Sequence, residues 1–198
     1  MKDHTLKKLA GYKEFSGPVV FMVLDGVGLG KQDESDGVWL AYTPLLDELM
    51  KEPLYTTLKA HGKAVGMPSD DDMGNSEVGH NALGAGRVFD QGAKLVNAAI
   101  EKGQIWKGDA WKEVMARAQQ GGTVHLMGVL SDGNVHSHID HVFALLDQCA
   151  KEDVARVRIH MLTDGRDVEE RTALDYVRPL EAKLKALSAD GRDYRIAS

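Results

Sequence analysis

The stretch TVHLMGVLSDGNVHSHIDHVFALLDQCA, residues 123–150, contains an apolar run, a polar turn and a second run with helical spacing. The apolar run over 123–130 predicts a buried strand, and the spacing over 139–150 predicts a helix. The same order recurs, with a strand over 156–162 and a helix from about 170 to 187. Strands that alternate with helices predict an α/β fold, a mostly parallel sheet with helices on both faces.

Toward the N-terminus of that stretch, the pattern predicts helices over 91–102 and from Asp109, with Asp109 as the cap and Gly121-Gly122 ending the second helix. Toward the C-terminus, Pro179 is expected to kink its helix, and residues 194–198 resemble the opening of a strand. These elements belong to the same alternating series.

The first part of the chain has fewer signals. The apolar run over 19–24 predicts a strand buried on both faces, and Thr43-Pro44 opens a short helix. Residues 56–86 form a long, glycine-rich stretch of a kind that is usually functional or joins two units.

The composition excludes several classes of protein. A net charge of −6 without a basic run argues against nucleic acid or an anionic membrane as the partner. Cys149 is the only cysteine, which excludes a disulfide framework and suits a reducing compartment. Residues 1–17 are too polar for a signal peptide, and no apolar run reaches membrane-spanning length. We therefore expect a soluble cytoplasmic protein.

Three apolar runs end in similar turns, each with an aspartate followed by a glycine, at Asp25, Asp132 and Asp164. Ligands of open parallel sheets bind beyond the carboxyl ends of the strands, where these turns are expected. Asp-Gly is also favourable turn chemistry in itself. Three such turns nevertheless favour a ligand-binding edge.

Several familiar motifs are incomplete. DGVGLG, residues 25–30, lacks the third glycine of the dinucleotide motif, and the phosphate-binding loop motif is absent. HSHIDH, residues 136–141, matches the H-x-H-x-D-H pattern of the metallo-β-lactamase fold, and imidazoles bind zinc or manganese well. Only His160 remains downstream as a further histidine ligand. We favour a polar turn that presents His136 to an anion, with His138 and His141 solvated or capping a helix.

Three other positions have two interpretations each. Asp25 is either a capping residue or a ligand for a hard cation. Arg166 and Asp167 follow a predicted strand, so the guanidinium either binds a carboxylate or phosphate or makes a weak surface ion pair. Ser76 either caps a helix with Asn75 or uses the unpaired N–H groups of a helix N-terminus to hold a phosphate. As a nucleophile Ser76 would need activation, for which a metal is the natural agent.

Four segments together resemble one family, the cofactor-independent (2,3-bisphosphoglycerate-independent) phosphoglycerate mutases of the plant and trypanosomatid type. These segments are VLDGVGLG, MGNSEVGHNALGAGRV, GVLSDGNVHSHIDH and LTDGRDV, and the resemblance runs from about residue 19 to residue 198. It implies an alkaline-phosphatase-like metal-binding domain, of which residues 1–90 are the N-terminal segment. It also implies an inserted α/β transferase domain over 91–198, incomplete at its C-terminus.

The resemblance implies a reaction and a role for each matching residue. The expected activity is that of an isomerase which interconverts 3-phosphoglycerate and 2-phosphoglycerate in glycolysis and gluconeogenesis through a phosphoserine. Asp25 matches a metal ligand, and Ser76 matches the nucleophile, which also touches a metal. His136 matches a substrate-binding residue. Arg166 and Asp167 match residues that hold the glycerate, with Asp167 a candidate for proton transfer at its hydroxyls. His138 and His141 then have no implied ligand role.

The implied cofactors are two divalent metal ions, manganese first with cobalt or magnesium as alternatives, and no bisphosphoglycerate. Further metal ligands and basic substrate residues are implied beyond Ser198. We therefore expect this chain to be inactive alone and to act with the remaining C-terminal part of a monomeric enzyme on phosphoglycerate. Two alternatives stay open, a metal-dependent phosphatase or phosphotransferase of the same superfamily and a non-catalytic anion-binding fragment.

Overall fold

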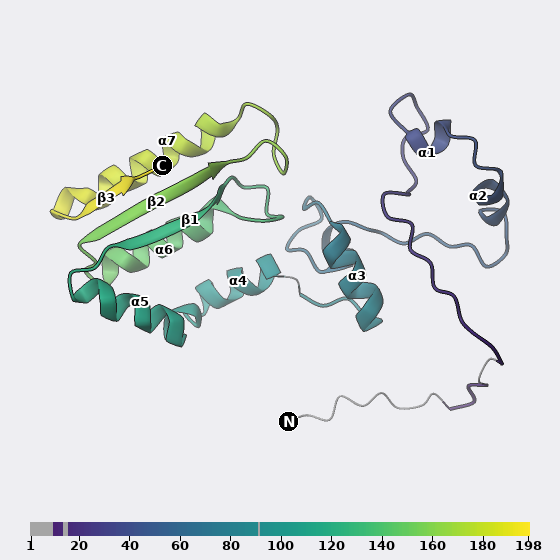
Figure 1. The fold of residues 1–198 in the computed structure, drawn as a ribbon, viewed down its shortest axis with the longest axis horizontal. Coiled ribbons are helices and arrows are strands. Elements are labelled where there is room, and N and C mark those ends of the chain that lie inside the picture. Colours follow the sequence, from purple (N-terminus) through teal and green to yellow (C-terminus); the bar gives the residue numbers. More distant parts are fainter. Residues whose placement is uncertain (1–9, 14–15, 91) are drawn as a thin grey trace. The chain divides into compact units, whose positions relative to one another are not determined.

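The computed structural model describes residues 10–13, 16–90 and 92–198, which form two units, Met1–Thr56 and Thr57–Ser198 (Figure 1). Part of the N-terminal stretch that is too polar for a signal peptide lies outside the described residues. Gln91, at the predicted domain boundary, also lies outside them. That boundary, between residues 90 and 91, stays a prediction.

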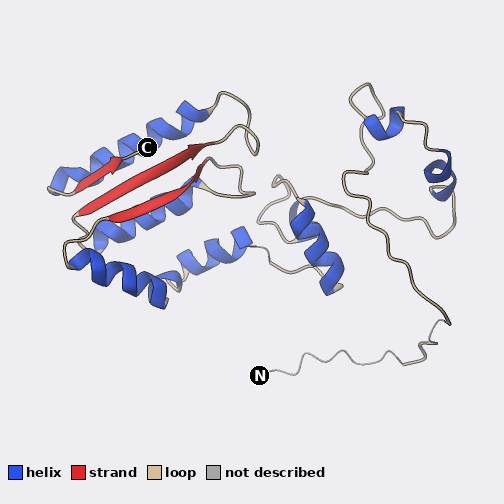
Figure 2. Ribbon diagram, in the orientation of Figure 1, coloured by secondary structure: helices blue, strands red, loops and turns tan. Residues whose placement is uncertain are grey.

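The second unit contains most of the regular structure. Its elements are η1 (Gly62–Val65), α3 (Ser76–Ala85), α4 (Gly92–Glu101), η2 (Ile105–Lys107), α5 (Asp109–Gln119), β1 (Val124–Leu130), α6 (Ile139–Lys151), β2 (Arg156–Thr163), α7 (Ala173–Leu187), η3 (Ser188–Asp190) and β3 (Asp193–Ile196). Its strands are parallel in the order β1-β2-β3, and helices run alongside them (Figure 2). The predicted α/β fold with a parallel sheet is confirmed.

One face of the sheet is packed against helices. Alternate strand residues, among them Val124, Val157 and Tyr194, share an apolar cluster with residues of α5, α6 and α7. The residues between them face the other way, and Met127 and Leu162 are exposed there. Among the described residues the helices that join this cluster therefore cover one face, and the predicted second helical layer is not seen.

Most predicted elements of this unit agree with the structure to within a few residues, because each has a clear local signal. One cap differs, since the N-cap of α5 is Gly108 and Asp109 is the first helical residue. A carboxylate there still interacts favourably with the free N–H groups of the helix start. Pro179 lies inside α7, which begins three residues later than predicted.

The first unit, by contrast, contains only α1 (Gly37–Leu40) and α2 (Pro44–Leu49) as regular elements among its described residues. The buried strand predicted over 19–24 is wrong here, because these residues form no strand and Val19, Val20 and Phe21 are largely exposed. A strand needs neighbours for its backbone hydrogen bonds, and the described residues of this unit supply none. Asp25 follows the run in a turn closed by a hydrogen bond from Val27 N–H to Leu24 O.

Cys149 lies in the apolar cluster and is fully buried. Burial raises the pKa of its thiol to about 12, with a smaller effect from Glu152. We expect Cys149 to resist iodoacetamide in the folded chain at about pH 8, because the thiolate is the reactive form. Mass spectrometry should find label only after unfolding in urea. Fast labelling of the folded chain would contradict this packing.

Within the described part of the chain, no helix is both long and apolar enough to cross a lipid bilayer.

Candidate functional site

The turns that follow β1 and β2 are joined by a short hydrogen bond. Strand register places Leu130 beside Thr163, so the next residues of the two strands are also neighbours. The Ser131 hydroxyl donates to Asp164 Oδ2 at 2.5 Å, and Ser131 is almost fully buried. The predicted meeting of these two polar turns at the carboxyl edge of the sheet is therefore observed.

Asp164 organises the second turn. Its Oδ1 accepts backbone N–H groups from Gly165, Arg166 and Asp167 at 2.7, 2.9 and 3.1 Å. The Ser131 hydroxyl, supported by these N–H groups, lowers the pKa of Asp164 to about 2. A carboxylate that stays ionised and fully bonded is a poor proton acceptor, so Asp164 holds its neighbours in place.

Removal of the Ser131 hydroxyl should change the titration of Asp164. Because the folded pKa lies below the ordinary value, Asp164 stabilises the fold above its unfolded pKa and loses this effect as the pH falls toward 2. In Ser131→Ala we expect the Asp164 pKa to rise toward 3.8 and acid unfolding to begin at a higher pH. Carboxyl NMR titration measures the first and circular dichroism the second. Ser188→Ala, whose hydroxyl bonds Tyr194, is the control, and an unchanged Asp164 pKa in Ser131→Ala would contradict the assignment.

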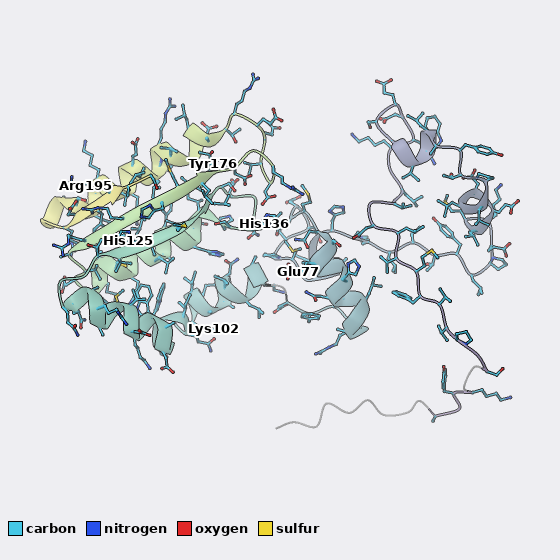
Figure 3. The ribbon with its side chains drawn as sticks, in the orientation of Figure 1. Glu77, Lys102, His125, His136, Tyr176 and Arg195 are labelled. Atoms are coloured by element: carbon cyan, nitrogen blue, oxygen red, sulfur yellow. The ribbon has the colours of Figure 1, made fainter. Side chains whose placement is uncertain are left out.

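His136 and Asp167 form a pair between the two turns. His136 Nδ1 lies 2.6 Å from Asp167 Oδ2, and the His136 side chain is 63% exposed against 9% for Asp167. Gly133 makes room for this approach, because a Cβ there would lie 2.6 Å from Asp167 Cβ. An ionised carboxylate only accepts hydrogen bonds, so Nδ1 carries a proton and Nε2 stays open to a ligand. Figure 3 shows His136 on the loop beyond β1.

Arg166 completes this edge as an exposed cation next to Asp167. Its backbone N–H is held by Asp164, so the side chain starts from an ordered turn. Guanidinium binds carboxylates and phosphates through two parallel hydrogen bonds. The edge therefore combines an arginine that can bind an anion with an imidazole whose Nε2 can accept a hydrogen bond from a hydroxyl.

Ser76 is the first residue of α3, and Asn75 is its N-cap. Asn75 Oδ1 accepts the N–H of Val78 at 3.0 Å, so the cap function belongs to Asn75 and not to Ser76. The Ser76 hydroxyl lies 3.1 Å from His80 Nδ1, which also lies 2.7 Å from the Ser76 carbonyl oxygen. Sequence reasoning missed His80, although a spacing of four residues on a helix was the signal for it.

A close backbone contact before Ser76 requires glycine at Gly74. A Cβ at Gly74 would lie 1.9 Å from the Ala60 carbonyl oxygen, whereas Gly79 and Gly84 have open space around them. Gly74 therefore lets the segment before α3 lie against residues 60–61, where its N–H is accepted by His61 Nδ1 at 3.0 Å.

The HSHIDH segment has structural roles. His138 is the N-cap of α6, and its Nδ1 accepts the N–H of Asp140. His141 Nε2 lies 2.5 Å from Asn97 Oδ1 on α4, and burial lowers the pKa of His141. The contact of His138 agrees with the capping interpretation, whereas His141 is partly buried against α4 and is neither solvated nor a cap. Within residues 10–13, 16–90 and 92–198, no three His, Cys, Asp or Glu side chains form a group that could hold a metal.

The predicted site residues therefore fall into two sets. His136, Arg166 and Asp167 lie together at the carboxyl edge of the sheet, and Ser76 belongs to the same unit. Asp25 belongs to the unit Met1–Thr56, so its role beside Ser76 in a metal site stays a prediction.

Comparison with known proteins gives three kinds of match. The family profile described as BPG-independent PGAM N-terminus matches residues 96–198. A probable 2,3-bisphosphoglycerate-independent phosphoglycerate mutase of Leptospira interrogans is 52% identical over 186 residues, which cover 92% of this chain and 34% of that protein. The 2,3-bisphosphoglycerate-independent phosphoglycerate mutase of Trypanosoma brucei brucei is 49% identical over 182 residues, 91% of this chain and 33% of its own length.

A solved structure of Leishmania mexicana phosphoglycerate mutase at low cobalt concentration matches with a TM-score of 0.83 and 44% identity, over 88% of this chain and 32% of that chain. The chain thus spans about a third of the length of the relatives it matches.

Proposed function

Because the chain belongs to the family described as BPG-independent PGAM N-terminus, we propose that it forms part of an enzyme that interconverts 3-phosphoglycerate and 2-phosphoglycerate. The remaining C-terminal part of that enzyme is its partner, and bisphosphoglycerate is not required. The observation that carries the proposal is the edge formed by His136, Arg166 and Asp167, in one unit with a serine at a helix start.

The edge suits a small substrate with two anionic groups, a carboxylate and a phosphate. Arg166 can hold the carboxylate or phosphate of a phosphoglycerate in a forked, two-bond geometry. His136, oriented by Asp167, can accept a hydrogen bond from a glycerate hydroxyl through Nε2. Through its hydrogen bond to His136, Asp167 can then take part in proton transfer at the glycerate hydroxyls.

Ser76 is the proposed phosphate carrier. Its Oγ attacks the phosphorus of 3-phosphoglycerate and loses its proton, while the bond from phosphorus to the C3 oxygen breaks and that oxygen takes up a proton. The glycerate stays bound, and its C2 hydroxyl then attacks the phosphorus of the phosphoserine and loses its proton. The bond from phosphorus to Ser76 Oγ breaks, and Oγ takes up a proton. The positive potential of the N-terminus of α3 favours a phosphate on Ser76.

Asp25 and Ser76 are the proposed ligands that this chain contributes to two divalent metal ions. Carboxylate and hydroxyl oxygens suit manganese, magnesium or cobalt, but the described residues alone do not complete a metal site. When bound, such ions would make a serine hydroxyl more acidic and neutralise phosphate charge. We place the remaining ligands in the C-terminal part of the enzyme, and the whole as a monomer in the cytoplasm.

A substrate and metal comparison on the whole enzyme tests this function. We expect turnover of 3-phosphoglycerate to exceed that of p-nitrophenyl phosphate, to disappear with EDTA and to return with manganese, because the edge selects a carboxylate-bearing ester. Faster turnover of the generic ester would favour the phosphatase or phosphotransferase alternative. Mutase activity of the 198-residue chain alone would reject the view that it is inactive by itself, and with it the anion-binding alternative.

A further inference from the structure

One partly buried hydrogen bond joins the segment before Ser76 to the loop that carries His136. Asn134 Nδ2 donates to Asp72 Oδ1 at 2.8 Å, across 62 residues of sequence. Asp72 precedes Ser76 by four residues, and Asn134 precedes His136 by two. The contact also crosses the domain boundary predicted between residues 90 and 91.

Asp72 is well fixed on its own side of the contact. Its Oδ2 accepts the N–H of Ser69 at 2.6 Å, and its carbonyl oxygen accepts the N–H of Gly62 at 3.1 Å. Burial acts to raise the pKa of Asp72, but the bonds from Asn134 and Ser69 outweigh it, so the pKa is lowered. The carboxylate is therefore charged at neutral pH, which strengthens its bond to the Asn134 amide.

Asn134 is held in an unusual conformation that suits this contact. Its φ is 60°, in the left-handed region that glycine adopts most easily, and its residue is only 9% exposed. Its N–H donates to Ser137 O at 3.0 Å, which closes the loop around His136. Glycine would relieve the backbone at this position but could not supply the amide donor. Asparagine supplies that donor and also tolerates φ above zero.

The amide has one favourable orientation. Asn134 Oδ1 is buried and has no hydrogen-bond partner among the described residues. Rotation of the amide by half a turn would bring this oxygen against the Asp72 carboxylate, where two acceptors repel. The hydrogen bond to Asp72 therefore sets the orientation of the Asn134 amide, even though an unpaired buried oxygen is unfavourable.

We propose that the Asp72–Asn134 hydrogen bond is a positioning clamp that holds the Ser76 segment in register with the His136 loop. Neither side chain is a catalytic residue, since each acts through the segment to which it belongs. The inference rests on the proposed function for its catalytic consequence, but the clamp itself is a property of the fold.

Exchange of the two side chains tests the clamp in the whole enzyme. Asn134→Asp places two carboxylates face to face, and we expect kcat to fall about 10²-fold with KM changed much less, because misplacement of reacting groups by about 1 Å has this effect. The kcat of Asp72→Asn should lie between that of Asn134→Asp and that of the wild type. The double variant Asp72→Asn/Asn134→Asp restores a bond of reversed polarity, and kcat should recover by at least about tenfold over Asn134→Asp. Asn97→Asp, an amide-to-acid change on α4, is the matched control and should stay within about twofold of the wild type.

Hydrogen exchange provides a readout that needs no catalysis. In the 198-residue chain, Asn134→Asp should increase exchange of the α3 amides, and the double variant should restore their protection. If the variants lose stability but keep the kcat of the wild type, the positioning role is wrong. If kcat of the double variant falls by the product of the two single-variant factors, the two side chains do not act through a shared hydrogen bond. An enzyme without mutase activity would refute the proposed function, while the exchange data would still decide the clamp.

Discussion

Ser76→Ala is expected to reduce phosphoglycerate mutase activity of the whole enzyme by at least about 10⁴-fold, because loss of a covalent nucleophile removes the reaction path itself. Ser76 is an exposed first residue of α3, and Asn75 supplies the cap, so the substitution removes the hydroxyl and its 3.1 Å contact with His80 Nδ1 but keeps the helix cap. Alanine is also a good helix former.

Two measurements check this expectation. A coupled assay with manganese gives the rate in each direction, and mass spectrometry of acid-quenched enzyme should find phosphate on the Ser76 peptide of the wild type only. Ser35→Ala, which removes an exposed hydroxyl bonded to Asp33, should leave the rate within about twofold. Turnover of Ser76→Ala at the wild-type rate would remove Ser76 from the mechanism.

Leu146→Ala should give the largest loss of stability, about 3 kcal/mol of the free energy of unfolding. Leu146 is fully buried on α6, in the cluster that joins the helices to the sheet. Truncation removes apolar contacts and leaves a cavity, and the loss is large against the 5–15 kcal/mol that is typical of a whole domain. Urea denaturation followed by circular dichroism measures the change.

Met127→Ala is the matched control for this experiment. Met127 lies on β1 and is 78% exposed on the other face of the sheet, so we expect a change within about 0.5 kcal/mol. The two variants thus distinguish the packed face from the open face. Equal losses in both would contradict the one-sided packing described above.

Prediction from sequence succeeded where the signal is local. Continuous apolar runs identified β1 and β2, and helical spacing identified α6 to within one residue at its end. These segments find their partners within a short stretch of chain, since β2 pairs with both β1 and β3. The run over 19–24 has the same composition, but its described neighbours include no strand to pair with, so its pattern did not become a strand.

The candidate site residues were named one by one from the sequence, but their contacts were not. Arg166, Asp167 and His136 could be named because their motifs place them after strands. The supporting bonds, such as Ser131 to Asp164 and Asn134 to Asp72, join residues 33 and 62 positions apart. No periodic pattern connects such pairs, because their distance depends on strand register and loop closure.

By itself the sequence determined the alternation of strands and helices, the family to which the chain belongs, and the candidate residues from Asp25 to Asp167. Each of these follows from spacing or motif, which the linear chain already contains. Only the tertiary structure decided which face of the sheet is packed, that Asn75 and not Ser76 caps α3, and that His136 is paired with Asp167. Those outcomes depend on which distant side chains exclude water and donate hydrogen bonds to each other, and folding alone settles that.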